Sequence, residues 1–393
     1  MPFVIYTLTG CLLRRAALVL VLASTVALGT SAGESAAAAA DIFSVGGISV
    51  DETADTAAAA RTVAFRRGQR AAMDTLLRRL TLRSDHGRLP SINNDRLNFL
   101  VQALEVAGEK TSNVRYLATL TVTFKPGEIR RLLREADIPF AETPSKPVLV
   151  LAVQQQGGAL VLWDDPNLWR EAWSQLQLSG GLVPLIVPVG DLNDIIDVDA
   201  TQAAEGDPLR LSAIARRYGA GDVLVAIATL SDDGELIQID IAASRIGSPN
   251  QTSVLLSIQS TDPLAVPEVL RAAAADVAAA VEDSWKATNI IEFDRPGRMV
   301  VAVPLASLEQ WVSVERRLNS IASISEISLI SFTRNSAEIE IIHFGDENQL
   351  ATTLAQLDLA LEPRAPISPG ADPFRSIQTN QALRIRVLRP VAP

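Results

Sequence analysis

The chain has 393 residues with 35 Lys or Arg, 45 Asp or Glu and 2 His, so its formal net charge is −10. This length predicts two or three domains. The negative charge argues against nucleic acid and anionic lipid as partners, because both are bound mainly through Lys and Arg. One cysteine and two histidines exclude a disulfide framework, a thiolate metal site and a His-rich zinc site, so we expect no cofactor and no metal ion.

Residues 1–40 have the order of a secretory signal peptide. Arg14–Arg15 precede a charge-free apolar run over Ala16–Leu28, and small residues follow with possible cleavage after Ala32 or Ala40. The run has 13 residues, fewer than the roughly 20 that span a bilayer, so a cleaved signal is favoured over a retained membrane anchor. The sequence therefore predicts an exported protein. Its mature part lacks cysteine, because the only cysteine leaves with the signal.

The first predicted domain, residues 41–143, has a small α+β pattern. Its strands alternate apolar and polar residues, and its long helix repeats small or apolar residues every four positions. Gly46–Gly47 indicates a bulge or bend in the first strand. The expected elements are a strand over Ile42–Val50, helices over Thr53–Leu82 and Asp95–Ala107, a strand over Val114–Phe124 and a helix over Glu128–Ala136. We therefore expect two strands backed by helices.

The second predicted domain, residues 144–290, begins with a Pro-rich linker and has an α/β pattern. Val148–Val153 is a continuous apolar run, which is typical of a strand buried on both faces. Asp165–Pro166 is suited to begin a helix that carries Trp169 and Trp173 on its apolar face. The full set is helices over Asp165–Gly180, Leu209–Tyr218 and Pro267–Lys286, and further strands over Leu182–Val189, Val223–Ala228, Leu236–Ala242 and Ser253–Ile258. This combination predicts a mixed sheet.

The third predicted domain, residues 291–362, shows the order βαββαβ of a ferredoxin-like fold. The expected elements are a strand over Arg298–Val303, a helix over Leu308–Ile321, strands over Ile324–Phe332 and Ala337–Phe344, and a helix over Asp346–Leu357. The last strand begins at Leu359 or occupies Ala382–Leu388, which would extend the domain to residue 390. Residues 363–393 are rich in proline and predict an extended, partly mobile tail.

One aromatic and acidic segment is the candidate surface for a ligand or partner. It holds Trp163, Asp164, Asp165 and Trp169. Paired carboxylates can hydrolyse glycosides and aromatic faces stack on sugars, so the composition suits a sugar site. Adjacent Asp side chains rarely face each other across a substrate, however, and Trp169, on the apolar side of an amphipathic helix, is more simply explained as a core residue. We therefore expect a surface of this kind without assigning catalytic residues to it.

The densest acidic stretch does not form a calcium-binding motif. It holds Asp191, Asp194, Asp197, Asp199, Glu205 and Asp207. In a calcium loop that starts at Asp197, Gln202 stands where Gly is needed and Pro208 where the closing Glu is needed. We expect a solvated loop with helix caps instead. His86 and His343 have no motif around them, and we expect both to be structural or surface residues.

Several runs resemble a proteobacterial exported family described as domain of unknown function 2066. They are Val50–Asp51, Ala60–Arg61, Gly68, Ala71–Ala72, Leu76–Thr81, Tyr116–Ala118 and Phe124, with Pro147–Val150 and the Trp163–Trp173 region similar to the continuation of that family. The resemblance covers most of the mature chain and depends on patterning rather than on catalytic motifs. It implies an exported protein in the periplasm of a Gram-negative bacterium and no particular activity.

The middle domain contains a second, fold-level resemblance. Ala215–Leu230 (ARRYGAGDVLVAIATL) is similar to a helix–strand unit of envelope accessory domains. Examples are the N-terminal domain of the Tol translocation protein and the lipoprotein activators of peptidoglycan synthases. The match departs from that pattern because Gly221 separates Ala220 from Asp222, and likeness of fold does not establish function.

Together these features favour a non-enzymatic binding or assembly protein with a protein partner in the cell envelope. Three small modules without a catalytic constellation suit this function, because such modules hold partners at strand edges and grooves. Two alternatives stay open. A carboxylate-based envelope hydrolase would need two carboxylates converging in one pocket, with at least one raised pKa. A small-molecule receptor would have its pocket between the first and second domains.

Overall fold

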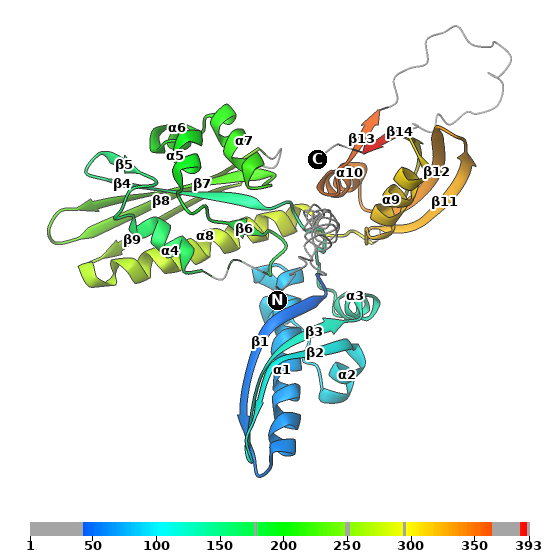
Figure 1. Cartoon of the computed structure of the whole chain (residues 1–393), viewed down its shortest axis with the longest axis horizontal. Coiled ribbons are helices and arrows are strands. Elements are labelled where there is room, and N and C mark those ends of the chain that lie inside the picture. Colours follow the sequence, from blue (N-terminus) through cyan, green and yellow to red (C-terminus); the bar gives the residue numbers. More distant parts are fainter. Residues whose placement is uncertain are drawn as a thin grey trace, which may run out of the picture. The chain divides into compact units, whose positions relative to one another are not determined.

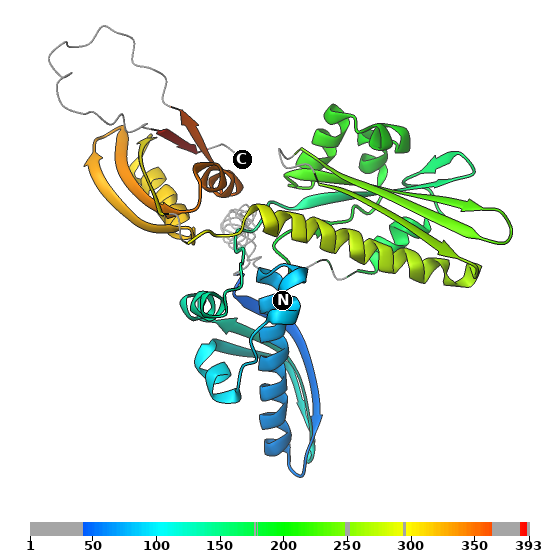
Figure 2. The ribbon, with the colours of Figure 1, turned by 180° about the vertical axis from the view of Figure 1, so that it is seen from behind.

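A computed structural model describes residues 42–176, 178, 180–247, 252–293, 296–363 and 386–390. These residues form a multi-domain α+β fold with three separate sheets, as the sequence predicts (Figures 1 and 2). The predicted signal segment and most of the Pro-rich tail lie outside the described residues. Within them, none of the helices has the length and apolar character needed to cross a bilayer.

The N-terminal sheet has three antiparallel strands in the order β1-β3-β2. Its elements are β1 (Ser44–Thr53), α1 (Ala57–Leu80), the 3₁₀ helix η1 (Arg83–Arg88), α2 (Asn94–Leu100), β2 (Val101–Thr111), β3 (Arg115–Phe124) and α3 (Pro126–Glu135). The predicted stripe of α1, which repeats every four positions, is buried against the sheet. At Gly68 the helix approaches β3 so closely that an added Cβ would lie 2.4 Å from Leu120 Cδ1.

Two expectations for this sheet have different outcomes. The register between β1 and β3 shifts between Val45 and Ile48, which confirms the bulge predicted at Gly46–Gly47. The predicted helix over Asp95–Ala107 is wrong beyond Leu100, because the chain continues there as β2. Leu97, Leu100, Val101 and Leu104 fit a helical spacing, but from Val101 onward the backbone pairs with β3. The sheet therefore has three strands rather than two.

The middle sheet is mixed, in the order β5-β4-β7-β8-β9 with β6 paired to β4. Its elements are β4 (Val148–Gln156), β5 (Ala159–Val161), α4 (Leu168–Ser174), β6 (Leu185–Ile186), α5 (Leu192–Asp197), α6 (Ala200–Glu205), α7 (Pro208–Arg217), β7 (Asp222–Asp232), β8 (Ile237–Ile246), β9 (Ser253–Ser260), the 3₁₀ helix η2 (Pro263–Ala265) and α8 (Val266–Thr288). Strand β4 runs parallel to β7 and β6, whereas the β7–β8 and β8–β9 pairs are antiparallel.

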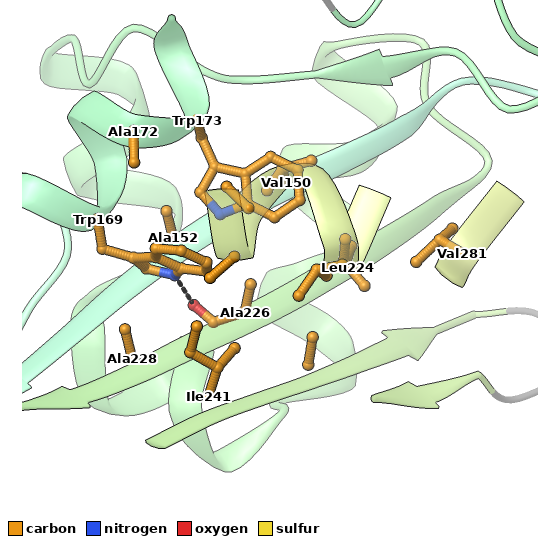
Figure 3. Close-up of a cluster of buried hydrophobic side chains, with 14 of the residues drawn as sticks. Val150, Ala152, Trp169, Ala172, Trp173, Leu224, Ala226, Ala228, Ile241 and Val281 are labelled. Carbon is orange, nitrogen blue, oxygen red and sulfur yellow. Dashed lines mark hydrogen bonds between the residues drawn. The ribbon is translucent and has the colours of Figure 1, made fainter. Parts of the chain in front are cut away.

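Helices cover both faces of this sheet, so β4 is buried on both sides. Val148, Val150 and Ala152 pack with α4 and α8 on one face, and the alternate residues of β4 pack with α6 and α7 on the other (Figure 1). Trp169 and Trp173 of α4 form the centre of the first layer. The indole of Trp169 donates to the main-chain carbonyl of Ala226 at 2.9 Å (Figure 3).

Two element boundaries in the middle domain differ from the prediction. The helix begins at Leu168 with Asn167 as its N-cap, rather than at Asp165–Pro166, and it ends at Ser174. The Asn167 side chain accepts from the N–H of Arg170 and donates to three main-chain carbonyls, which fixes the start of the helix. The predicted strand Leu182–Val189 is only the two-residue β6, in keeping with the prolines at either end, which have no N–H to donate to a sheet.

The C-terminal sheet has five strands in the order β11-β12-β10-β14-β13. Its elements are β10 (Pro296–Pro304), α9 (Leu308–Asn319), β11 (Ile324–Phe332), β12 (Ser336–Phe344), α10 (Glu347–Gln356), β13 (Leu359–Pro363) and β14 (Arg386–Pro390). The chain order βαββαβ runs from β10 to β13. Both candidates for the last strand are present, because β14 lies between β10, to which it is parallel, and β13, to which it is antiparallel.

Candidate functional site

Helix α5 has its apolar face turned outward. Leu192, Ile195 and Ile196 follow the i, i+3, i+4 spacing of one helix face, yet they are 77%, 48% and 72% exposed. The buried residue of this helix is instead Asp194, at 0% exposure. Amphipathic helices on a globular protein normally have the opposite orientation, with the apolar stripe toward the core. The inverted orientation of α5 therefore requires a physical explanation, and its exposed apolar face suggests a binding function.

Val189 extends this exposed surface. It lies two residues before the N-cap Asp191 of α5 and is 77% exposed. We call Val189, Leu192, Ile195 and Ile196 the α5 apolar surface. Single exposed apolar residues are ordinary, whereas a contiguous exposed group marks an interaction site.

A polar cluster holds α5 in its inverted orientation. The Asp194 carboxylate accepts from the guanidinium of Arg217, from the hydroxyl of Tyr218 at 2.9 and 3.0 Å, and from the backbone N–H groups of Gly190 and Asp191 at 2.8 and 3.1 Å. Arg217 also binds Asp197 at 2.8 Å. The two side-chain donors come from the end of α7, so α5 is tied to α7 by hydrogen bonds and ion pairs.

The cluster is sensitive to the loss of any member. A buried carboxylate is costly to desolvate and is tolerated when its oxygens are fully hydrogen-bonded. Burial, and then the Asp194 carboxylate, raise the pKa of Tyr218 above its usual value, so the hydroxyl keeps its proton and donates. The backbone N–H of Asp194 holds the pKa of Asp191 below its usual value. Within α5 itself, the buried contacts are therefore charged and hydrogen-bonded rather than apolar.

A cavity of about 700 Å³ lies beside the α5 apolar surface. Its lining residues belong to α4 and to the segments before and after it: Asp165, Pro166, Asn167, Arg170, Glu171, Trp173, Ser174, Leu176, Leu178, Val187, Pro188 and Val189. Val189 lines the cavity, so the cavity reaches the segment that leads into α5. All lining residues lie within the middle module, and the cavity is thus not the inter-domain pocket that the receptor hypothesis expects.

The residues of the predicted ligand or partner surface have different surroundings. Asp165 lines the cavity and binds Arg170 at 2.8 Å. Asp164 is exposed, and Trp163 is partly buried with its indole donating to the carbonyl of Val198 at 2.7 Å. Trp169 is 0% exposed (Figure 3), so it has no surface that a partner could reach. Of the four residues, only Asp165 lines the cavity.

The stretch predicted as a solvated acidic loop instead forms two short helices, α5 and α6, and three of its six acidic residues are helix N-caps. Asp191, Asp199 and Asp207 are the N-caps of α5, α6 and α7, which confirms the capping prediction. Asp194 is buried instead of solvated. The i, i+3, i+4 spacing of Leu192, Ile195 and Ile196 indicates a helix at α5, but the aspartates around these residues favour a loop.

Among the described residues, no group of three His, Cys, Asp or Glu side chains is placed to hold a metal ion.

The two histidines are in unlike environments. His86 lies in η1, with its Nδ1 3.3 Å from the guanidinium of Arg78. His343 is buried in β12, at 3% exposure. A Cβ added to Gly297 of the paired strand would lie 2.5 Å from the His343 ring, so the imidazole fills the space above that glycine.

The carboxylates that line the cavity have local partners. Asp165 binds Arg170, and Glu171 accepts from the side-chain amide of Gln175 at 3.2 Å. The described carboxylate with a raised pKa is Glu142, whose buried side chain accepts from Arg130 at 2.9 and 3.0 Å. Burial is the main cause of that shift. Glu142 does not line this cavity.

Comparisons with known proteins leave the family open. No family model matches the chain. No curated protein matches it. Among solved structures, the C-terminal domain of LpoB from Salmonella enterica covers 34% of this chain and 93% of its own, at 17% identity and a TM-score of 0.19. An uncharacterized protein covers 36% and 94%, at 13% identity and a TM-score of 0.18. Scores of this size establish neither a family nor a function, and the resemblance to domain of unknown function 2066 stays a prediction.

Proposed function

We propose that this chain is a non-enzymatic accessory protein of the bacterial cell envelope that binds another protein through the α5 apolar surface. The observation that carries the proposal is the inverted helix. Asp194 is buried and bonded on the inner side of α5, while three large apolar side chains at helical spacing face outward. Because a polar cluster holds these apolar side chains outward, they are available to a partner and do not contribute to the core.

The size of the apolar surface indicates how much partner contact is needed. Burying one large apolar side chain contributes about 1.5 kcal/mol or more, so the four residues contribute about 6 kcal/mol. Association itself costs roughly 4–15 kcal/mol. The α5 apolar surface alone therefore gives weak binding, and a stable complex requires further contact. The adjoining cavity, which shares Val189, is placed to supply it.

The compartment in this proposal comes from the sequence. Residues 1–40 have the order of a secretory signal, and the mature part that it predicts lacks cysteine. The partner is accordingly sought in the envelope, where it would meet the exported chain.

A photo-crosslinking experiment tests the proposal. A benzophenone amino acid is placed at Leu192 in the full chain in cells, with Glu235 of the β7–β8 turn as the matched exposed control. We expect a discrete crosslinked product from position 192 that disappears when Ile196→Glu is added, and no such product from position 235. Equal products from both positions, or a product that Ile196→Glu leaves unchanged, would contradict the proposal.

A further inference from the structure

The middle module is strongly negative, whereas the rest of the chain is nearly neutral. Residues 144–290 contain 8 Lys or Arg and 19 Asp or Glu, a net charge of −11. The other residues contain 27 basic and 26 acidic side chains and nearly cancel. The acidity of the protein is therefore concentrated in the module that carries the α5 apolar surface.

Acidic side chains also border that surface. The stretch from Val187 to Asp199 holds four Asp and no Lys or Arg. Arg217 contacts three of these four carboxylates, yet the side chains of Asp191 and Asp197 remain 48% and 26% exposed. Arg217 therefore supplies one positive charge to three carboxylates.

A further carboxylate borders the cavity next to α5. Asp165 is 85% exposed and binds Arg170. Arg170 extends to the chain just before α5, because a Cβ on Gly190 would lie 2.6 Å from its Nη1. Asp165 therefore lies on the cavity rim that adjoins Gly190 and Asp191. We call Asp165, Asp191 and Asp197 the acidic rim.

From this arrangement we infer that the protein segment docking on the α5 apolar surface is a cationic amphipathic one, with an apolar stripe flanked by Lys or Arg. The inference depends on the proposed function and specifies the chemistry of its partner. Apolar residues of the segment cover Leu192, Ile195 and Ile196, while its basic residues face the acidic rim.

Charge complementarity favours this partner over other occupants. An anionic lipid surface or a nucleic acid would be repelled by the rim, since both are bound through basic residues. A second copy of the module would bring two acidic rims together, and like charges facing each other disfavour association. A cationic segment instead gains steering during encounter, which raises its association rate and makes that rate depend on salt.

Two matched peptides test the inference on the full chain. Both are amphipathic helices of about 18 residues with the same Leu and Ile stripe, and their polar positions are all Lys in one and all Glu in the other. The variants are Asp165→Asn with Asp191→Asn, and, as the charge-matched control, Asp232→Asn with Asp233→Asn in the β7–β8 turn. Asparagine keeps the helix cap at position 191, because Asn caps helices as well as Asp does. Circular dichroism verifies that each variant is folded.

We expect the Lys peptide to bind the unaltered chain more tightly than the Glu peptide, and its affinity to fall as salt rises. The rim variant should weaken Lys-peptide binding about fivefold, because it removes two of the three carboxylates that face the basic residues of the peptide. The turn variant should change it less than about twofold. Equal binding of the two peptides, or equal effects of the rim and turn variants, would overturn the inference.

The same measurement separates the inference from the proposed function. Ile196→Glu should abolish binding of both peptides if the α5 apolar surface is the docking site. If both peptides bind equally and both need Ile196, the docking surface is upheld and its cationic partner is wrong. If neither binding event depends on Ile196, the docking surface itself is wrong.

Discussion

Helices α4 and α5 have the same apolar spacing and opposite orientations. The buried face of α4 holds Trp169, Ala172 and Trp173, and the apolar face of α5 holds Leu192, Ile195 and Ile196, so both follow i, i+3, i+4. The three residues of α4 are at most 3% exposed, whereas those of α5 are at least 48% exposed. The spacing shows that a helix has an apolar face, but it does not show which way that face points.

What differs is the other side of each helix. Opposite its tryptophans, α4 carries Glu171 and Ser174, which remain at the surface. Opposite its apolar face, α5 carries Asp194, which α7 binds through Arg217 and Tyr218. The polar partners of Asp194 are 23 and 24 residues away along the chain. A long-range polar contact therefore decides the orientation of a short helix that has little apolar area of its own to bury.

The largest expected effect belongs to the inward-facing helix. Trp173→Ala should destabilise the chain by about 3–5 kcal/mol, because a wholly buried indole leaves a cavity in the core. Denaturant unfolding followed by tryptophan fluorescence measures it, since four of the five tryptophans lie in the middle module. A cost below about 1 kcal/mol would mean that the α4 layer is not the packed core described here.

Removing the anchor of α5 should have the next largest effect. Asp194→Ala leaves the Arg217 guanidinium and the Tyr218 hydroxyl without their shared acceptor, at a cost of about 3 kcal/mol. Amide hydrogen exchange should also show lost protection in α5. Asp199→Ala, which removes only an exposed cap of α6, is the control and should cost about 1 kcal/mol. Equal losses of stability in the two variants would contradict the claim that Asp194 anchors α5 whereas Asp199 only caps α6.

Tyr218→Phe should have a smaller, pH-dependent effect of about 1 kcal/mol at neutral pH. The folded pKa of Tyr218 lies above its usual 10.0, first through burial and then through Asp194. The stabilisation by the hydroxyl is therefore complete below about pH 10 and is lost as the pH rises through the folded pKa. The stability difference between the unaltered chain and Tyr218→Phe should shrink over that range. A difference that stays constant to high pH would show that the hydroxyl does not serve the anchor.

The smallest expected effect belongs to the outward-facing helix. Ile196→Ala should change the free energy of unfolding by no more than about 0.5 kcal/mol, because the side chain is 72% exposed. The same denaturant measurement applies, with Trp173→Ala as its counterpart. A cost above about 2 kcal/mol would mean that Ile196 is buried in the folded chain, and the contrast between α4 and α5 would be lost.

Strongly periodic elements were predictable from the sequence, and contact-dependent ones were not. The buried strand β4, the long helix α8 and the βαββαβ order of the C-terminal sheet follow from local pattern. Strand β2 was predicted as a helix, because Leu97, Leu100, Val101 and Leu104 follow a helical spacing, whereas pairing with β3 makes the chain a strand from Val101 onward. The site was missed for a similar reason. Nothing near Asp194 in sequence indicates that Tyr218 and Arg217 bury it.

Cysteine labelling at position 196 tests the central claim most directly. The single native cysteine, Cys11, is replaced by Ser, and Ile196→Cys is compared with Asp233→Cys in the exposed β7–β8 turn. A maleimide is applied to intact envelopes and to the purified chain. We predict that position 196 reacts freely in the purified chain and is protected in envelopes, while position 233 reacts equally in both. Equal reactivity of position 196 in the two samples would contradict the claim that a partner covers the outward face of α5.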